Sequence, residues 1–502
     1  MKLHIINKVI SWFFKKRKHQ MELFLKYPID VQHELLLRLL YTAKDTEIGK
    51  KYHFSSITNY TTFTQNVPIK TYESIEHYIE RGRKGEQNIF WPSKIKWFAK
   101  SSGTTNAKSK YIPVSDEALD NCHYKAVKDM LCLYVNNNGN TKMFSGKNLR
   151  LGGSSAVYED NDTYFGDLSA IIIENLPLWA DYSSAPKQKT ALMGDWETKM
   201  DRIVAETINE DITNLAGVPS WMLVLLHKVL EVTGKDNILE VWPNLEVYFH
   251  GGVNFNPYRE QYKKIIPKAD FKYYETYNAS EGFFAIQDRN DSEELLLMLD
   301  YGIFYEFIPM EKFDGENSTA IPLEEVVLEK NYALIITTNS GLWRYLIGDT
   351  IKFTSLNPYR IKITGRTKHF INTFGEELII DNAEQALKNA CEKTNSEILD
   401  YTAGPIFMEG NAKGAHEWII EFSKEPKNMA IFTEILDNSL KAINSDYEAK
   451  RFLNLTLNLP TVHKAKKGLF YKWLKKNNKL GGQHKVPRLC NTRRILDELK
   501  EL

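Results

Sequence analysis

The residues FAKSSGTTNAKSKYIP, from Phe98 to Pro113, form the stretch around which the rest of the chain is organised. Four hydroxyl side chains and a glycine fill positions 101–105, and strand-like alternation precedes them. Ser and Thr hydroxyls bind phosphate oxygens without adding charge, while glycine lets backbone N–H groups approach an anion closely. The stretch predicts a phosphate-binding loop between two strands, with an ordinary polar hairpin turn as the alternative. It is not a Walker loop, because the second glycine followed by Lys and Ser/Thr is missing.

The overall composition is that of a large globular protein. With 502 residues, of which 43% are hydrophobic, the chain can bury a large core and form two or more domains. Its 65 Lys and Arg against 64 Asp and Glu leave a formal net charge of +1, so no nucleic-acid partner is expected. Its four cysteines lie far apart without metal-ligand spacing, which fits a reducing, cytoplasmic environment.

The N-terminal segment carries apolar and aromatic residues followed by the basic cluster Lys15-Lys16-Arg17-Lys18. A secretory signal has the reverse order, so export is not expected. Weak contact with a membrane surface is one interpretation of this segment, and an amphipathic helix folded onto the protein is the other. No apolar run approaches the roughly 20 residues that a transmembrane segment needs.

Helix signals occur on both sides of the opening stretch. The first 45 or so residues have helical periodicity with Asp30 as an expected N-cap, and Ser115 is expected to cap a helix whose buried stripe includes Cys122. We interpret Cys122 as a core residue, because the histidine beside it in the chain would not face it on a helix. Ser220 is expected to begin a further helix that Gly234 ends.

The segment from about residue 245 to 348 reads as short strands with few helices between them. Three polar segments, 250–254, 277–282 and 343–349, are expected to form turns between these strands. Turns held by a strand scaffold often carry binding residues. The pattern therefore predicts an α/β protein with functional groups on these turns.

A change of composition near residues 365–368 predicts a domain boundary and a hinge. We expect an N-terminal domain of residues 1–365 and a C-terminal α+β lid domain of residues 366–502. In the second domain Asp381 and Glu384 predict a capping box, and strands and helices then alternate.

Several polar motifs occur in an order that is more specific than any one of them alone. They are SSGTT at 101–105, GVPSW at 217–221, GGVNFNPY at 251–258, YNASEG at 277–282, the segment from Tyr345 to Asp349, Gly365-Arg366, and GGQHKVPRL at 481–489. The set resembles the adenylate-forming superfamily of acyl-CoA synthetases and firefly luciferase. More closely, the chain resembles a bacterial-type member of the acyl acid-amido synthetases known as the auxin-responsive promoter family.

This resemblance implies a large N-terminal adenylate-forming domain of mixed sheets and helices and a small, mobile α+β C-terminal domain. It implies an ATP- and Mg²⁺-dependent ligase that activates a carboxylic acid as its adenylate and joins the acyl group to an amino acid. The substrates react with each other, so the protein aligns them and neutralises phosphate charge. An acyl-CoA ligase with the same first step is the first alternative, and a non-catalytic nucleotide-binding protein is the second.

The resemblance also assigns residues to the nucleotide's phosphates and metal. The expected phosphate-binding residues are Ser101, Ser102, Gly103, Thr104, Thr105 and Lys110, with Lys108 as the alternative lysine. Ser280 is expected at the α-phosphate, and Glu281 is expected to hold Mg²⁺, which accepts one carboxylate plus phosphate oxygens and water. For Glu281 the alternative is an ordinary surface carboxylate in a turn. The catalytic groups implied are Glu281, Thr105 and Lys485.

The remaining assignments concern the nucleoside and the acyl group. Those for the nucleoside are Gly251, Gly252 and Val253 beside the adenine, Tyr277 stacked on it, Asp349 on the ribose hydroxyls, and Arg366 on the ribose or as an anchor of the hinge. Lys485 is expected to reach the phosphates or the carboxylate during adenylation, and a solvated loop lysine is the alternative. If the C-terminal domain rotates, Lys485 moves out and the amine enters. Ile171, Trp179 and Trp221 are guesses for the acyl pocket from apolar content alone.

Overall fold

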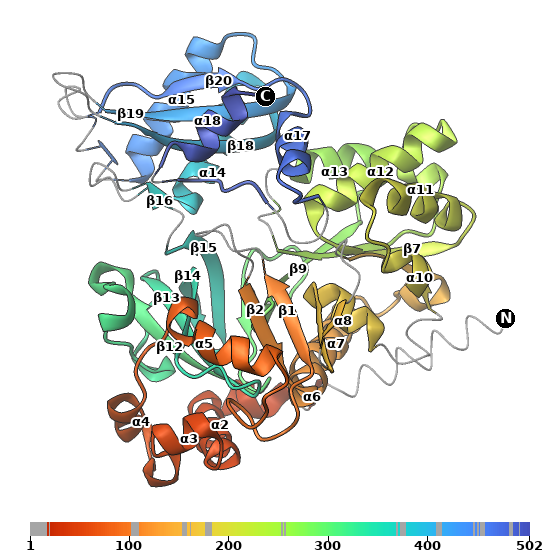
Figure 1. Cartoon of the computed structure of the whole chain (residues 1–502). Helices are drawn as coiled ribbons and strands as arrows, with labels where there is room; N and C mark the ends of the chain where they lie inside the picture. Colours follow the sequence, from red (N-terminus) through yellow and green to blue (C-terminus); the bar gives the residue numbers. More distant parts are fainter. Residues whose placement is uncertain are drawn as a thin grey trace.

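The computed structural model shows a large N-terminal part built on one wide sheet and a smaller α+β part at the C-terminus (Figure 1). Residues described are 18–502 except 20, 102–109, 153–157, 161, 176–182, 253–254, 256–257, 368–369, 372–377, 408–413, 445–446, 449–450, 452–456, 481–484 and 491. The predicted mixed α/β fold with a large and a small domain is confirmed.

The wide sheet has eleven strands in the order β12-β13-β14-β15-β11-β10-β9-β8-β7-β3-β6. Their bounds are β3 Lys147–Leu151, β6 Ser184–Ala185, β7 Ile212–Gly217, β8 Val247–Gly251, β9 Lys272–Ala279, β10 Gly282–Ile286, β11 Leu295–Leu297, β12 Ile303–Pro309, β13 Asn331–Thr338, β14 Tyr345–Leu356 and β15 Tyr359–Arg366. The strands from β6 to β9 are parallel, and those from β9 to β12 are antiparallel. Ligands of open α/β sheets gather at the carboxyl ends of such parallel strands.

A second sheet of four strands lies in the order β2-β1-β5-β4. Its strands are β1 Trp97–Ser101, β2 Lys110–Val114, β4 Tyr158–Asp160 and β5 Thr163–Gly166. Strands β1 and β2 form an antiparallel hairpin in which Ser101 pairs with Lys110. The two strands expected around the opening stretch are therefore confirmed, and positions 102–109 between them lie outside the described residues.

Helices surround both sheets of the N-terminal part. They are α2 Pro28–Ala43, α3 Glu47–Lys51, α4 Tyr60–Asn66, α5 Tyr72–Arg83, α6 Asp116–Ala118, α7 Lys125–Asn137, α8 Leu168–Glu174, α10 Gln188–Ala191, α11 Trp196–Thr207, α12 Pro219–Thr233 and α13 Arg259–Ile265. A π-helical segment, 119–124, joins α6 to α7. Within the described residues, no helix is both long and apolar enough to cross a membrane.

The C-terminal part is built on a three-stranded sheet, β18-β19-β20, covered by helices. Its elements are β16 Phe370–Ile371, β17 Leu378–Ile379, α14 Ile380–Thr394, β18 Glu397–Ile406, β19 Ala415–Lys424, α15 Met429–Ile443, β20 Thr461–Lys464, α17 Leu469–Lys476 and α18 Arg494–Lys500. Helix α17 lies beside α12 and α13 (Figure 1), and apolar side chains of α17 and α18 share a core cluster with α11, α12 and α13. The two parts are therefore docked against each other in this structure.

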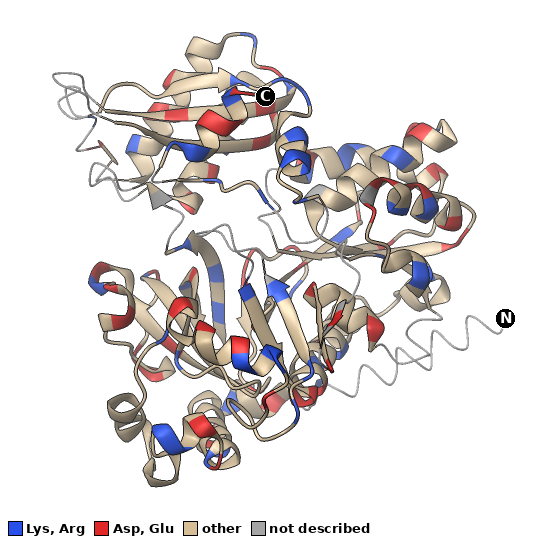
Figure 2. Cartoon of the chain, in the orientation of Figure 1, with Lys and Arg blue, Asp and Glu red and all other residues tan. Residues whose placement is uncertain are grey.

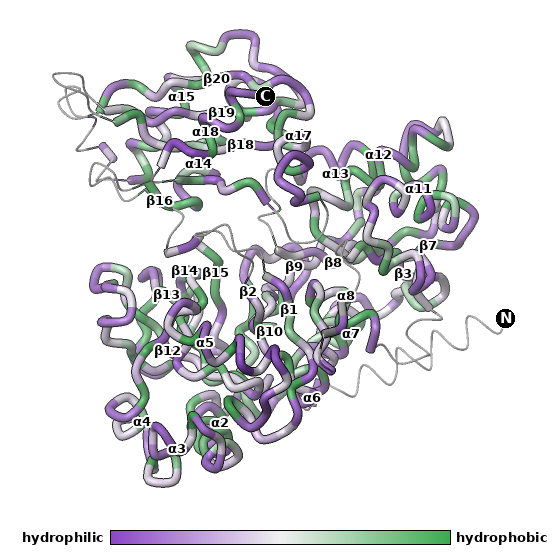
Figure 3. Tube along the Cα trace, viewed as in Figure 1, coloured by the Kyte–Doolittle hydropathy of each residue, from purple (hydrophilic) through white to green (hydrophobic). Residues whose placement is uncertain are grey.

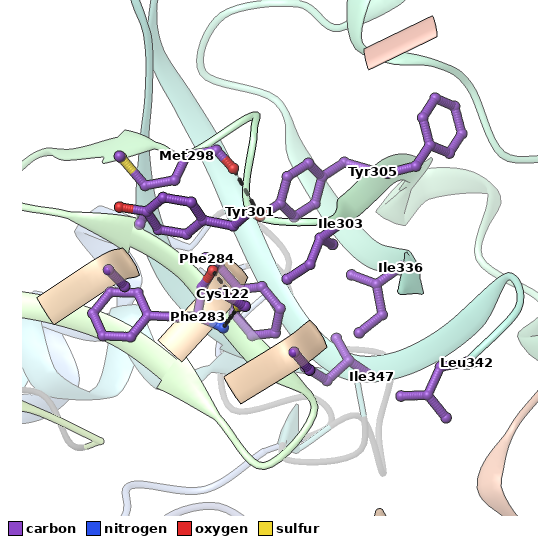
Figure 4. Close-up of a cluster of buried hydrophobic side chains, with 14 of the residues drawn as sticks. Cys122, Phe283, Phe284, Met298, Tyr301, Ile303, Tyr305, Ile336, Leu342 and Ile347 are labelled. Carbon is purple, nitrogen blue, oxygen red and sulfur yellow. Dashed lines mark hydrogen bonds between the residues drawn. The ribbon is translucent and has the colours of Figure 1, made fainter. Parts of the chain in front are cut away.

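The largest core cluster packs the N-terminal helices and α7 against the antiparallel half of the wide sheet. Figure 4 shows Cys122 in this cluster, bonded to the backbone of Phe283, whose N–H donates to the Cys122 Sγ at 3.2 Å. Burial raises the pKa of the Cys122 thiol to about 12. Cys122 is therefore a packed core residue, as predicted.

Hydrophobic residues run through the strands of the wide sheet (Figure 3), and charges of both signs are mixed along the chain (Figure 2).

Some predicted helix caps differ from the structure. Ser115 caps α6 by accepting from the Ala118 N–H, and Gly234 ends α12 in the left-handed conformation (φ +64°), both as predicted. Helix α2 begins at Pro28, so Asp30 lies in its first turn and is not the N-cap. Proline is favoured at a first helical position, since it has no N–H to satisfy there. For the same reason α12 begins at position 219, and Ser220 is not its cap.

The predicted capping box at Asp381 and Glu384 is also wrong. Helix α14 begins two residues earlier than this box implies, at Ile380, and the Asn382 side chain accepts from the Ile379 N–H at 3.4 Å. A turn is present within 277–282, at positions 280 and 281 between β9 and β10, but most of 343–349 is strand, because β14 begins at Tyr345. Of the expected turn at 250–254, positions 250 and 251 belong to β8, and 253 and 254 lie outside the described residues. Ladder hydrogen bonds and buried neighbours outweighed the polar composition of these segments.

Candidate active site

Asp349 is held by two side chains from other strands of the wide sheet, Arg366 of β15 and Tyr277 of β9. It follows Gly348, which has a φ of +90°, on β14, and it pairs directly with Arg366 on β15. The Arg366 Nε lies 2.8 Å from the Asp349 Oδ1, and the Tyr277 hydroxyl donates to the Asp349 Oδ2 at 2.7 Å. Asp349 is 6% exposed. Both carboxylate oxygens are thus fixed in orientation and retain lone pairs for a ligand.

The partners of Asp349 keep the protonation states that these bonds need. Burial and the adjacent Asp349 carboxylate raise the pKa of Tyr277 well above its ordinary value, so the hydroxyl remains a donor. The same carboxylate raises the pKa of Arg366, which stays a cation. The result is a fixed acceptor for hydroxyl donors.

Ser280 and Glu281 form the two-residue connection between β9 and β10. Ser280 is buried, and Glu281 is half-buried. Burial raises the pKa of Glu281, and the nearby Lys110 ammonium opposes this shift. Lys110 opens β2, within the stretch quoted first, so the β1–β2 hairpin brings a cation to the Glu281 turn.

Two glycines lie at the carboxyl end of β8, and the first of them, Gly251, has no room for a side chain. A Cβ on Gly251 would lie 2.5 Å from the Thr276 carbonyl oxygen, and Gly252 has a φ of +80°. A Cβ on Gly252 would lie 3.5 Å from the Val218 Cγ2 and 3.9 Å from the Lys485 Nζ. Three motifs that are far apart in sequence, at 217–221, 251–258 and 481–489, therefore meet at Gly252.

Lys485 brings a positive charge from the C-terminal part to this place. Desolvation by the surrounding protein and the Arg366 cation lower the pKa of Lys485 to about 8, while Asp349 and Glu384 oppose the shift. The side chain itself is exposed, so it lies among protein groups without being sealed from water. At pH 7 the amine is still mostly protonated.

The structure brings together most of the predicted site residues that it describes. Tyr277 and Arg366 each bond to Asp349, Gly252 lies beside Lys485, and the Lys110 charge opposes the rise in the pKa of Glu281. Outside the described residues lie Ser102, Gly103, Thr104, Thr105, Lys108 and Val253, together with the side chain of Ser101.

The sequence did not indicate all of the groups at this site. Val218 lies in the motif at 217–221, but the sequence gives it no functional role, whereas in the structure it lies beside Gly252. Glu384 is expected from the sequence to cap a helix, whereas in the structure its charge opposes the fall in the pKa of Lys485. Of the acyl-pocket guesses, Ile171 and Trp221 are buried in core clusters, and Trp179 lies outside the described residues. Periodicity alone does not distinguish pocket from core.

The residues present suit a magnesium ion that is held mainly by phosphate. In the part of the chain that the structure describes, no group of three His, Cys, Asp or Glu side chains gathers to hold a metal ion. Mg²⁺ in nucleotide sites takes one or two carboxylates plus phosphate oxygens and water, so a single residue such as Glu281 is compatible with it.

The fold is that of the acyl-adenylate-forming enzymes. A 2-hydroxyisobutyryl-CoA ligase solved in its postadenylation state, with an acyl-AMP bound, matches with a TM-score of 0.61 and 13% identity over 94% of this chain and 90% of that one. The GH3.15 acyl acid amido synthetase in complex with 2,4-DB matches with a TM-score of 0.80 and 17% identity, over 99% of this chain and 96% of that one.

Family profiles define the chain more narrowly. The GH3 family N-terminal domain matches residues 17–271, the central domain 296–366, and the C-terminal domain 381–494. The chain belongs to the GH3 family, which confirms the family expected from the motifs.

Curated relatives are amide-forming ligases. An indole-3-acetic acid-amido synthetase, GH3.3 of Arabidopsis thaliana, is 23% identical over 93% of this chain and 90% of that protein. A 4-substituted benzoates-glutamate ligase, GH3.12 of the same plant, is 22% identical over 94% of each. The expected class of enzyme, a ligase of the acyl acid-amido synthetase family, is confirmed.

Proposed function

We propose that this chain uses ATP and Mg²⁺ to join a small carboxylic acid to an amino acid. In the first half-reaction a carboxylate oxygen bonds to the α-phosphorus of ATP and pyrophosphate leaves. In the second, the amine nitrogen bonds to the acyl carbon, the bond to AMP breaks, and the amine loses a proton. The observation that supports this most is the fixed Asp349 carboxylate beside a cationic Lys485.

Asp349 is the group that would accept hydrogen bonds from the ribose hydroxyls, because Tyr277 and Arg366 already hold it in place. The backbone of Gly251 and Gly252 would lie against the adenine, and the Tyr277 ring would stack on it. The phosphate loop at 101–105 and Lys110 would bind the β- and γ-phosphates. Ser280 would contact the α-phosphate.

Glu281 would hold the magnesium ion together with the phosphates. When bound, Mg²⁺ neutralises phosphate charge and makes the α-phosphorus more open to attack. The nearby Lys110 charge lowers the pKa of Glu281 and would thereby keep the carboxylate ionised for this role. Lys485 would stabilise the charge that develops as the acid attacks.

We propose a domain division at residues 1–365 and 366–502, with a hinge near 365–368. The C-terminal domain would act as a mobile lid that carries Lys485 in for adenylation and out again for entry of the amine. We also propose a cytoplasmic location, which the four free cysteines support.

The experiment that tests adenylation is ATP–pyrophosphate exchange with a panel of aromatic and aliphatic carboxylic acids, including indole-3-acetate and 4-substituted benzoates. We expect exchange that depends on both the acid and Mg²⁺. A chain that binds ATP but gives no exchange with any acid of the panel would be a non-catalytic nucleotide-binding protein.

The pH dependence of exchange should report the charge on Lys485. Its pKa of about 8 means that the amine is cationic below this pH, so exchange should fall as the pH rises above 8. Lys485→Arg keeps its charge at any accessible pH, and any activity that it retains should persist at pH 9. If wild type and Lys485→Arg lose exchange in parallel, another group causes the loss.

A further inference from the structure

A row of polar contacts joins Tyr258 and helix α13 of the N-terminal part to Arg488 and strand β18 of the C-terminal part. Positions 258, 261 and 264 are spaced by three residues, so they lie on one side of the helix. The contacts are Tyr258 with Arg488, Gln261 with the Ile398 carbonyl oxygen at 3.3 Å, and Lys264 with Glu397. The Lys264 side chain is 60% exposed, so water screens its ion pair. Tyr258 is only 4% exposed.

Arg488 donates the hydrogen bond to Tyr258, and other hydrogen bonds hold its side chain within the C-terminal domain. Its Nη1 donates to the Asp400 carboxylate and to the Tyr401 carbonyl oxygen at 3.0 Å. Its Nη2 donates to the Tyr258 hydroxyl of the other domain at 3.0 Å. Because Asp400 already orients the guanidinium, little further side-chain entropy is lost when Arg488 meets Tyr258.

The two partners are tied closely to the active site. Arg488 lies three residues after Lys485, and the chain between them is fixed because Val486 is buried and the Pro487 carbonyl oxygen accepts from the Thr402 hydroxyl at 2.6 Å. The Arg488 carbonyl oxygen also accepts from the Ala403 N–H at 2.8 Å. Lys485 therefore cannot shift far relative to Arg488.

On the other side, Tyr258 closes the motif that Gly251 and Gly252 open. Tyr258 directly precedes α13, and its backbone N–H donates to the Phe255 carbonyl oxygen at 2.9 Å. The Arg488–Tyr258 bond thus joins the two motifs whose other members, Lys485 and Gly252, face each other.

We propose that Arg488 and Tyr258 are positioning residues that hold the C-terminal domain in the arrangement for adenylation. Their hydrogen bond keeps the Lys485 amine at the carboxyl end of β8, and it must break before the domain can turn for the second half-reaction. This inference rests on the proposed function of Lys485.

The test is Tyr258→Phe, which removes one hydroxyl and keeps the ring. Exchange is measured with the acid most active in the wild type, and amide formation is measured separately from the supplied acyl adenylate. We expect kcat for exchange to fall by about tenfold, since the lost bond has a charged donor. Amide formation should stay at the wild-type rate or rise. Arg488→Lys should also lower kcat for exchange, because a lysine ammonium cannot donate to Asp400 and Tyr258 in the geometry of the guanidinium.

A second background separates positioning from a general loss of structure. In Lys485→Ala, the added Tyr258→Phe change should have no further effect on exchange, because the group that it positions is gone. Glu197→Gln is the matched control, because it removes the exposed interdomain ion pair with Lys475, away from Lys485, and should change exchange by less than about twofold.

Three results would overturn the inference, and they differ in whether they also overturn the proposed function of Lys485. Tyr258 would only support the fold if Tyr258→Phe lowered exchange by the same factor in the wild type and in Lys485→Ala. The same conclusion would follow if it lowered exchange and amide formation equally. Unchanged exchange in Tyr258→Phe, with exchange lost in Lys485→Ala, would remove the positioning role alone. Full exchange in Lys485→Ala would remove the proposed function of Lys485 together with its positioning by Arg488.

Discussion

Glu281→Gln should lower ATP–pyrophosphate exchange by about a thousandfold and make the remaining activity require more Mg²⁺. The change keeps the size of the side chain and removes the carboxylate that we propose holds Mg²⁺ beside the phosphates. Loss of a charged ligand that acts on the transition state costs about 4 kcal/mol, which corresponds to about a thousandfold in rate. The measurement is exchange as a function of Mg²⁺ concentration.

The control for this variant is Glu311→Gln, which removes an exposed carboxylate paired with Lys330 on the surface. It should leave the rate and the Mg²⁺ requirement unchanged. If Glu281→Gln lowers exchange by less than about tenfold, with the same Mg²⁺ requirement as the wild type, then Glu281 is a turn carboxylate and the metal is held elsewhere.

Asp349→Ala should lower exchange by a similar factor, mainly through a higher KM for ATP. It removes the acceptor for both ribose hydroxyls, and charged hydrogen bonds are worth about 1.5–3 kcal/mol each. Tyr277→Phe should have a smaller effect, about tenfold, because Asp349 remains but one of its oxygens is no longer held. The readout is the KM for ATP in both variants.

The effect on folding should be small, which keeps this comparison interpretable. Arg366 loses its partner in Asp349→Ala, but its side chain is 40% exposed and water can solvate the charge. Thermal unfolding checks this expectation. An unchanged KM for ATP in a stably folded Asp349→Ala protein would contradict the ribose assignment.

The sequence predicted the order of the motifs but not how they contact one another. Asp349 and Arg366 were each assigned to the ribose, and their direct pairing depends on the register of β14 with β15, which no local pattern encodes. The motif indicates only the ring of Tyr277, as a surface for stacking, and gives no role to its hydroxyl. That hydroxyl bonds to Asp349 although β10, β11 and β15 lie between β9 and β14 in the sheet, so only the three-dimensional fold brings the two residues together.

Local signals were reliable where local energetics dominates. Ser115 caps its helix because the hydroxyl accepts from a backbone N–H three residues on, a contact that needs no distant partner. The polar residues of the segments that begin at Tyr277 and Tyr345 predict turns, although both tyrosines belong to long strands. Burial between neighbouring strands, which depends on the whole fold, determined their structure.

The central claim is that the acyl group passes from an adenylate to an amine. Mass spectrometry of the products tests it most directly, with ATP, Mg²⁺, an acid that supports exchange, a mixture of amino acids, and coenzyme A offered together. We predict an acyl amide of one or a few amino acids, with AMP and pyrophosphate released in equal amounts. A thioester of coenzyme A with no amide would contradict the account and identify the chain as an acyl-CoA ligase.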